Sequence, residues 1–204
     1  MARRPYTKQQ RARQEEQTRE RIVAAAAALH GEVGPRDTTV SAIAQRAGVQ
    51  RLTVYRHFPD SGALFRACSA HWLERNPPPD RAAWAGLEAP APRTRAALAA
   101  LYGYYRETAY MWERAYRDRD AVPAMEEPMR RFEAWLDELR DDLAGAWGPG
   151  AGPRGRAVLG HALRFRCWQS LAGEGLGDGA IADAMVTWLF ALAAEAGNGG
   201  PAGG

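Results

Sequence analysis

The stretch that decides the fold is residues 39–58, TVSAIAQRAGVQRLTVYRHF. Its first half carries apolar residues at the i, i+3, i+4, i+7 spacing of one helix face: Val40, Ile43, Ala44 and Ala47. Gly48 follows directly, and glycine readily adopts the left-handed backbone that commonly ends a helix. We therefore predict a helix, a turn of three to four residues and a second short helix.

The second helix of this stretch has one apolar side, formed by Val54 and Phe58 at i, i+4. Its other side chains point wholly or partly outward and suit a nucleic-acid duplex, because arginine bonds guanine, threonine offers a hydroxyl and a methyl, and tyrosine reaches phosphates. This pattern favours a helix-turn-helix whose second helix enters the major groove. The same turn with basic residues outside also occurs in ordinary helical bundles.

A wider stretch, residues 18–73, resembles the tetracycline-repressor (TetR) family of bacterial transcriptional regulators. The resemblance is strongest over DTTVSAIAQRAGV (residues 37–49) and VYRHFPDSGALF (residues 54–65). Its motif positions, in order, are Thr39, Ile43, Ala44, Ala47, Gly48, Val49, Tyr55, His57, Phe58, Ala63 and Leu64. The resemblance implies a homodimer in which a three-helix DNA-binding head precedes a larger helical domain that binds a small-molecule effector.

The DNA-contact candidates lie in and just before the second helix. We expect base contacts from Arg51, Thr53 and Leu52, and phosphate contacts from the positions Thr39, Tyr55, Arg56 and His57. Three positions depart from the family pattern: Gln50, Leu52 and Ser61. Leu52 either contacts thymine methyl groups or is buried. Since these departures fall where DNA is read, the operator sequence does not carry over from other family members.

Composition bounds the fold class. The chain has 204 residues with 46% apolar content, enough for a real core. Long Ala/Leu/Arg-rich stretches show helical periodicity, and none shows sustained strand-type alternation. We therefore predict an all-α protein, divided into a flexible basic arm (residues 1–14), the helix-turn-helix domain (15–58), a helical effector-binding and dimerisation domain (59–195) and a disordered tail (196–204).

Charge is concentrated at the N-terminal end. Residues 1–75 hold 13 Lys and Arg against 7 Asp and Glu, whereas residues 76–204 hold 14 against 17. A local positive field attracts a polyanion and makes its binding salt-dependent. The arm itself carries Arg3, Arg4, Lys8, Arg11 and Arg13; it either reaches the minor groove, as such arms do in some family members, or stays a disordered tail.

Helix ends follow from capping residues. The first helix is expected over residues 15–33, stopped by Gly34-Pro35. Thr38 or Thr39 caps the second helix, and Asp60 caps a connecting helix over residues 60–75. Cys68 and His71 lie at i, i+3 on that helix, but no further ligands are near, so we expect packing and no metal site. Residues 76–92 break helix propensity repeatedly.

Aromatic side chains are frequent in the helices after residue 92. Their spacing alone favours a well-filled core, whereas the resemblance implies a ligand pocket with a few polar tips. The ligand-binding candidates are Tyr102, Tyr105, Trp112, Trp135, Phe165 and Trp168. The expected effector is an apolar or aromatic small molecule.

The last two helices, expected over residues 156–172 and 179–194, are apolar on more than one face. One face can pack within its own domain and the other against a second copy, which predicts a homodimer through residues 156–194. Asp178 is expected to cap the last helix.

Other classes of protein find little support. Serine-hydrolase, P-loop and zinc-protease motifs are missing, and His30, His57, His71 and His161 are scattered, so we expect no enzyme and no cofactor. Two cysteines and no long apolar run indicate a cytoplasmic protein without a membrane span. We predict a DNA-binding transcriptional regulator, a repressor released by its effector; the alternative is a helical small-molecule-binding protein with weak or lost specific DNA binding.

Overall fold

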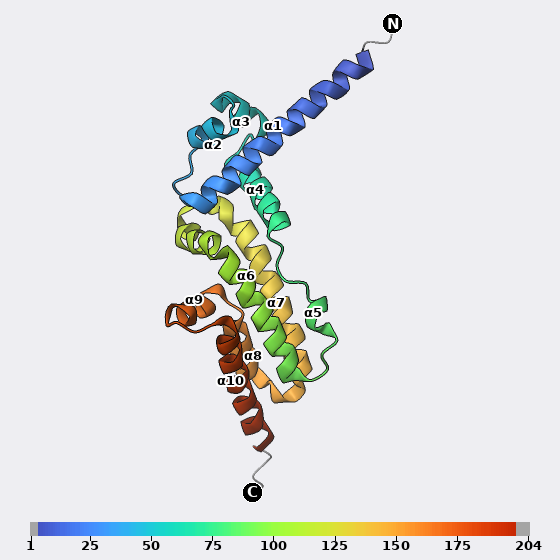
Figure 1. The fold of residues 1–204 in the computed structure, drawn as a ribbon, viewed down its shortest axis with the longest axis vertical. Coiled ribbons are helices and arrows are strands. Elements are labelled where there is room, and N and C mark those ends of the chain that lie inside the picture. Colours follow the sequence, from blue (N-terminus) through green and yellow to red (C-terminus); the bar gives the residue numbers. More distant parts are fainter. Residues whose placement is uncertain (1–3, 199–204) are drawn as a thin grey trace. The chain divides into compact units, whose positions relative to one another are not determined.

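The computed structural model describes residues 4–198, and the side chains of residues 8–149 and 151–195. Helices and connecting turns make up this part of the chain, which contains no strand, so the all-α prediction is confirmed. The chain divides into two compact units (Figure 1). The first, which we call the head unit, comprises Met1–Pro77 and Tyr110–Met129; the second, the body unit, comprises Pro78–Ala109 and Arg130–Gly204.

The head unit is built on four helices and is completed by one end of a fifth. These are α1 (Arg4–Glu32), α2 (Val40–Ala47), α3 (Arg51–His57), α4 (Ser61–Arg75) and the last turns of α6 (Pro90–Asp118), followed by the short 3-10 helices η1 (Arg119–Ala121) and η2 (Pro123–Met125). α1 packs against both α2 and α4. The predicted helix, turn and second helix over residues 39–58 are confirmed.

Capping explains where these helices begin and end. The Thr39 hydroxyl accepts a hydrogen bond from the Ala42 backbone N–H at 3.2 Å, and Asp60 Oδ1 accepts one from the Ala63 N–H at 2.7 Å. Gly48 ends α2 in the left-handed region at φ 65°, and the Val49 N–H then donates to the Ala44 carbonyl. The residue types predict the cap at Asp60 and the end at Gly48, and of the two candidates Thr38 and Thr39 it is Thr39 that caps α2.

The first helix is longer than predicted. It begins at Arg4, not near residue 15, so residues 4–14 are helical where a flexible arm was expected. Within this polar half the Thr18 hydroxyl donates a hydrogen bond to the Gln14 carbonyl, one turn back along the helix, at 2.8 Å. The sequence does not predict this part of the helix, because residues 4–14 have no apolar periodicity, which is the pattern that indicates a packed helix. Arg3 and the side chain of Arg4 lie outside the described residues.

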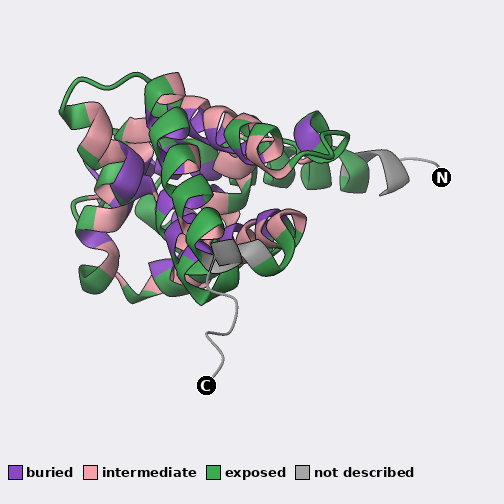
Figure 2. Cartoon of the chain, turned by 90° about the horizontal axis from the view of Figure 1, so that it is seen from below, coloured by how far each residue is buried: buried purple, intermediate pink, exposed green. Residues whose placement is uncertain are grey.

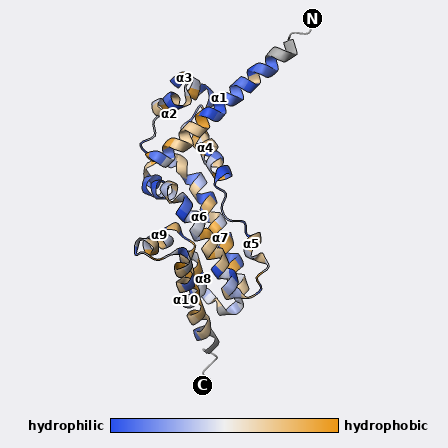
Figure 3. Cartoon of the chain, viewed as in Figure 1, coloured by the Kyte–Doolittle hydropathy of each residue, from blue (hydrophilic) through white to orange (hydrophobic). Residues whose placement is uncertain are grey.

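The body unit contains α5 (Ala82–Ala85), most of α6, most of α7 (Glu126–Trp147), η3 (Gly148–Gly150), α8 (Gly152–Ala162), α9 (Phe165–Gly173) and α10 (Asp178–Asn198). Figure 2 shows buried residues running along the inward sides of the helices, and Figure 3 shows the same alternation of apolar and polar faces. The predicted loop over residues 76–92 contains the short α5, whose Trp84 is buried.

The single helix predicted over residues 156–172 is broken. α8 ends at Ala162, Arg164 has an extended backbone (φ −83°, ψ 139°), and α9 begins at Phe165. Two buried tyrosines of α6 bind the carbonyls at the break: Tyr102 Oη donates to the Ala162 carbonyl at 2.9 Å and Tyr105 Oη to the Leu163 carbonyl at 2.8 Å. The partners lie about sixty residues away in the chain, which is why local pattern did not reveal the break.

The expected cap at Asp178 is also wrong in detail. Asp178 is the first residue of α10, and its carboxylate accepts hydrogen bonds from Arg106 and from the Trp168 indole. α10 continues to Asn198, beyond the predicted end at residue 194; residues 199–204 of the expected tail lie outside the described residues.

Across residues 4–198, no single helix has both the length and the apolar character to cross a bilayer. The stretches Phe165–Gly173 and Asp178–Glu195 reach that threshold only when taken together, and they are bent by 116°.

Candidate DNA-binding surface and aromatic core

The outward face of α3 is formed by a row of unburied side chains. Arg51, Leu52, Tyr55 and Arg56 are exposed, with Leu52 at 76% and Tyr55 at 47%, whereas Val54 and Phe58 are buried in the head core. The alternative that Leu52 is buried is therefore wrong, and its side chain is free to contact thymine methyl groups. Leu52 is the most exposed large apolar side chain among the described residues.

The remaining sequence candidates border this face. Thr39 is exposed at the start of α2, and Thr53 and His57 are half-buried on α3. The Nε2 atom of His57 is buried and has no hydrogen-bond partner among the described residues. Gln50 precedes α3 without a side-chain cap.

The core behind α3 joins the helices of the head. Ile22, Ala26, Ile43 and Val54 are almost fully buried in one cluster that also includes Leu64 and Cys68 of α4. Burial at about 25 cal/mol per Å² of apolar surface stabilises this arrangement. α3 has only seven residues, too few to be stable alone, so this packing holds it in place.

Two residues of the head core make a contact that sequence reasoning missed. The Cys68 sulfur lies 3.5 Å from His30 Nδ1, and the His30 ring stacks on Phe65 with centroids 5.0 Å apart. Burial lowers the pKa of His30 to about 4 and raises that of the Cys68 thiol to about 12, so both are neutral at pH 7. Among the described residues, no three His, Cys, Asp or Glu side chains gather as metal ligands would.

The last turn of α6 binds the loop that leads into α2. Buried Asp118 accepts hydrogen bonds from Arg117 Nε at 2.7 Å and from the Arg36 backbone N–H at 3.2 Å. Arg117 also donates to the Val33 carbonyl, and Arg114 to the Glu32 carbonyl, at 3.0 and 3.1 Å. These bonds satisfy carbonyls at the end of α1 that its own helix leaves free. From the sequence, Gly34-Pro35 indicates only that the first helix stops here, and it does not indicate the contacts with α6.

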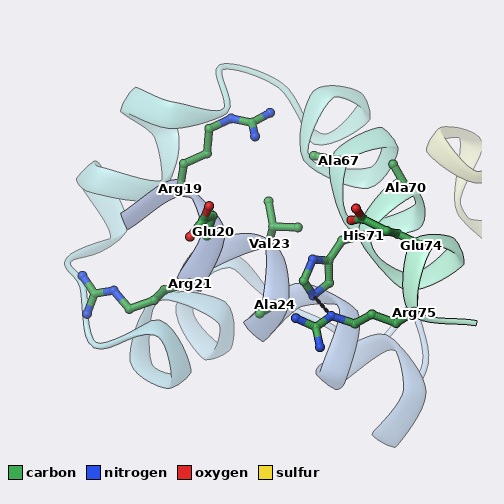
Figure 4. Close-up of a pocket in the computed structure, with 10 residues that line it drawn as sticks. All are labelled: Arg19, Glu20, Arg21, Val23, Ala24, Ala67, Ala70, His71, Glu74 and Arg75. Atoms are coloured by element: carbon green, nitrogen blue, oxygen red, sulfur yellow. Dashed lines mark hydrogen bonds between the residues drawn. The ribbon is translucent and has the colours of Figure 1, made fainter. Parts of the chain in front are cut away.

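An open groove of about 770 Å³ runs between α1 and α4 (Figure 4). Val23, Ala24, Ala67 and Ala70 line its apolar part, and charged side chains of both signs surround it. On its α4 side, Arg75 Nε donates to His71 Nε2 at 3.0 Å.

The six ligand-binding candidates fall into different places. Four of them, Tyr102, Tyr105, Phe165 and Trp168, are buried together in the body unit. Tyr105 lies 5.4 Å from Phe165 and 6.0 Å from Trp168, measured between ring centroids. We call these four residues the aromatic core.

The other two candidates contact other rings; for Trp135 this ring is Phe132, whose centroid lies 6.5 Å from that of Tyr105. Trp135 of α7 stacks on Phe132, and Arg81 lies 5.3 Å from its ring centroid. Trp112 belongs to the head unit, where it meets Trp72 edge-on at 5.8 Å. Periodicity predicts which of these residues are inward, but the units to which they belong depend on tertiary contacts.

Polar atoms around the aromatic core are paired within the body unit. Trp168 Nε1 donates to Asp178 Oδ1 at 2.8 Å, and Arg106 makes two bonds to the same carboxylate. The Arg106 guanidinium lowers the pKa of Asp178, with Trp168 contributing, so the carboxylate stays ionised near neutrality. Burial raises the pKa of Tyr102, whose hydroxyl therefore remains a donor.

Comparison with known proteins identifies the head. Residues 22–68, which run from α1 through α4, match the family model described as "Bacterial regulatory proteins, tetR family". A comparison with curated protein sequences gives no match.

Solved structures share the fold over nearly the whole chain. A TetR-like transcriptional regulator from Rhodococcus sp. RHA1 is 20% identical with a TM-score of 0.58, covering 90% of this chain and 97% of its own. A second Rhodococcus sp. RHA1 transcriptional regulator, also 20% identical with a TM-score of 0.58, covers 87% and 96%. The structure of RolR in complex with resorcinol, 20% identical with a TM-score of 0.51, covers 93% and 98%. The helix-turn-helix region, residues 22–68, is therefore that of the TetR family, which makes the protein a DNA-binding transcriptional regulator, and the chain shares its fold with TetR-like regulators over most of its length.

Proposed function

We propose that this regulator is a repressor that binds a pseudo-palindromic operator as a homodimer and is released by a small-molecule effector. The DNA-binding part of this proposal is supported by the row of exposed side chains on α3. The preceding helix, α2, begins at the Thr39 cap and ends at Gly48, as in a helix-turn-helix. Two such helices, one from each copy, would enter major grooves about one helical turn apart, roughly 34–36 Å. The role is one of binding, without a catalytic step, and we place it in the cytoplasm.

Each exposed position of α3 has a proposed partner. Arg51, Leu52 and Thr53 contact base edges, and Thr39, Tyr55, Arg56 and His57 contact phosphates. The Nε2 atom of His57 is buried, so its phosphate contact requires the side chain to turn outward on DNA binding. As functional divisions we keep residues 15–58 for DNA binding and residues 59–195 for effector binding and dimerisation.

The proposed effector site lies at the aromatic core. Its polar tips are the hydroxyls of Tyr102 and Tyr105, which donate hydrogen bonds to the buried carbonyls of Ala162 and Leu163 at the break between α8 and α9. An aromatic ligand with its own hydroxyl group offers the same kind of donor and the same ring contacts. The structurally similar RolR, solved with resorcinol, supports an aromatic effector here.

α6 is the proposed link between effector and DNA. This one helix carries Tyr102 and Tyr105 in the body unit and Asp118 in the head unit. Its head end contacts α4 through Trp72, whose Nε1 donates to Tyr110 Oη at 3.3 Å, and contacts the loop before α2 through Asp118. A ligand that displaced α6 would therefore change the position of α4 and of the helix-turn-helix, and with it the fit of the dimer to two half-sites.

The homodimer interface is proposed through residues 156–194. Trp188 and Phe190 of α10 are 48% and 63% exposed, on the sides of the helix that its buried residues Ile181, Met185 and Leu189 leave free. Exposed large apolar residues on one helix are typical of an interface with a second copy.

The first test is fluorescence anisotropy with duplex DNA from upstream of the protein's own gene, against a scrambled duplex, at two salt concentrations. We expect tight binding to the first duplex that weakens with salt. Arg51→Ala should weaken it by about 1–3 kcal/mol and reduce discrimination against the scrambled duplex, and Tyr55→Phe should weaken it less. Unchanged affinity in both variants would contradict these contacts.

The alternative function, a ligand-binding protein that has lost specific DNA binding, predicts equal and weak binding to both duplexes. Thermal unfolding with resorcinol and other simple phenols as probes tests the effector site separately. A phenol that raises Tm of the wild type, and not of a Trp168→Ala variant that still folds, supports the site. Equal shifts in the two proteins would contradict it.

A further inference from the structure

The N-terminal half of α1 leaves nearly all of its described side chains unburied in the head. Every described side chain from Lys8 to Glu20 is exposed except Thr18, which is half-buried. Ala12 is the only apolar residue in this segment. A helix that is polar on all sides gains nothing from burial, and a length of about a dozen residues is marginal in isolation. Any partner of this segment is therefore polar and lies outside the head.

The position of this segment is set by Arg19. Its guanidinium lies 5.1 Å from the centroid of the Phe58 ring, and Phe58 is the residue that ends α3. At 1.5 Å per residue, Lys8 lies roughly 16 Å farther along the helix. Figure 1 shows α1 running on past α2 and α3, away from the rest of the head unit. With α3 in a major groove, which is about 12 Å wide, this part of α1 is long enough to extend to the sugar-phosphate backbone beside that groove.

Charge is arranged on one side of this segment. At 3.6 residues per turn, Lys8, Arg11 and Arg19 lie within roughly 80° of one another, on the side that Arg19 turns toward α3. Glu15 lies on the same side, but the three basic side chains outnumber it, so the net charge of this side is positive. Arg13 lies roughly 120° away from Arg19, on the side of Glu16 and Glu20. A polyanion therefore suits one side and not the other.

We propose that residues 8–19 of α1 form a second DNA contact of the head, in which the intact helix binds backbone phosphates flanking the half-site through Lys8 and Arg11. This inference rests on the proposed operator binding by α3. A helix with side chains is about 10–12 Å wide and the minor groove about 6 Å, so the helix binds from outside the groove. The contact adds affinity that depends on salt but not on the flanking base sequence.

The test measures operator affinity of the full chain by anisotropy over a range of salt concentrations. The double variant Lys8→Ala/Arg11→Ala should lose about 10-fold in affinity, and its slope of log affinity against log salt should fall by about 2. Arg13→Ala is the control, since it removes one positive charge from the opposite side of the helix. Its operator affinity should stay within about 2-fold of the wild-type value. Glu15→Gln should strengthen binding. A double variant no weaker than Arg13→Ala would overturn the proposal.

A helix-breaking variant tests the bound conformation. Ala12 is exposed, so Ala12→Pro interrupts the helix without touching the head core. It should lose as much affinity as the double charge variant, whereas Ala12→Ser should bind like the wild type. Proline and serine variants of equal affinity would overturn the helical contact, and so would a requirement for A·T pairs in the flank, which would indicate minor-groove reading by an unfolded arm.

The two proposals fail differently. Wild-type protein that prefers the operator over the scrambled duplex, with variants that match it at every salt concentration, would leave the proposed function standing and refute the α1 contact alone. Wild-type protein without that preference would refute both.

Discussion

At the scale of single residues, Gly34 is where the head depends most on having no side chain. Its φ of 98° is in the region that favours glycine, and a Cβ there would overlap the Arg117 guanidinium and the Asp118 carboxylate. Gly34→Ala should therefore destabilise the protein by about 2 kcal/mol or more, because it adds backbone strain and displaces a buried ion pair. Urea unfolding followed by circular dichroism measures this loss.

Gly103→Ala is the matched control. Gly103 lies within α6, and nothing is within 4 Å of an added Cβ, so alanine should stabilise the helix by roughly 0.5–1 kcal/mol. Losses of equal size at both positions would show that the Arg117 and Asp118 contacts of Gly34 are unimportant.

At the scale of helices, the break between α8 and α9 depends on tyrosine hydroxyls from α6. Removing the Tyr102 hydroxyl in Tyr102→Phe leaves the buried Ala162 carbonyl without this donor, which should cost about 1–3 kcal/mol of unfolding free energy. Tyr110→Phe removes a hydroxyl that accepts a hydrogen bond from Trp72 Nε1 at an exposed position, where water can replace it, and should cost less than about 0.5 kcal/mol. Similar losses in the two variants would contradict a specific role for the break.

The contact between α1 and α4 should be sensitive to acid. Burial lowers the pKa of His30 to about 4 in the folded protein, from 6.5, despite the opposing effect of Asp118. The unfolded chain therefore takes up the proton first as pH falls, so stability is complete above pH 6.5 and is lost progressively toward pH 4. Between pH 7 and pH 5 we expect a loss of about 2 kcal/mol in urea unfolding.

A His30→Gln variant controls for the other titrating groups. Glutamine keeps a polar group near Cys68 but cannot be protonated in this range. Its unfolding free energy should change much less between pH 7 and pH 5, and a pH dependence as steep as that of the wild type would exclude His30 as the cause.

At the scale of the whole molecule, the proposed homodimer gives the exposed face of α10 its role. Trp188→Glu places a charge on this face without touching the packed residues Ile181, Met185 and Leu189. We expect the variant to sediment as a monomer at concentrations where the wild type is a dimer. Leu52→Glu, an equally disruptive change at the exposed apolar residue of α3, should leave the sedimentation coefficient unchanged. A dimeric Trp188→Glu protein would contradict an interface through this face.

Residue types and short-range spacing determined much of this protein. The all-α class, the helix-turn-helix, the caps at Thr39 and Asp60, the left-handed Gly48 and the inward Val54 follow from interactions within a few residues, which the chain encodes locally.

Only the tertiary structure decided the rest, because the partners are far apart in sequence. Asp118 meets Arg36 across 82 positions, Tyr102 meets Ala162 across 60, and Trp168 and Arg106 draw Asp178 away from the capping role that its position suggested. Leu52 has the same apolar side chain whether buried or exposed, so its exposure depended on which face of α3 packs. The helical N-terminal half of α1 has no apolar periodicity, and its sequence resembled a flexible arm for that reason.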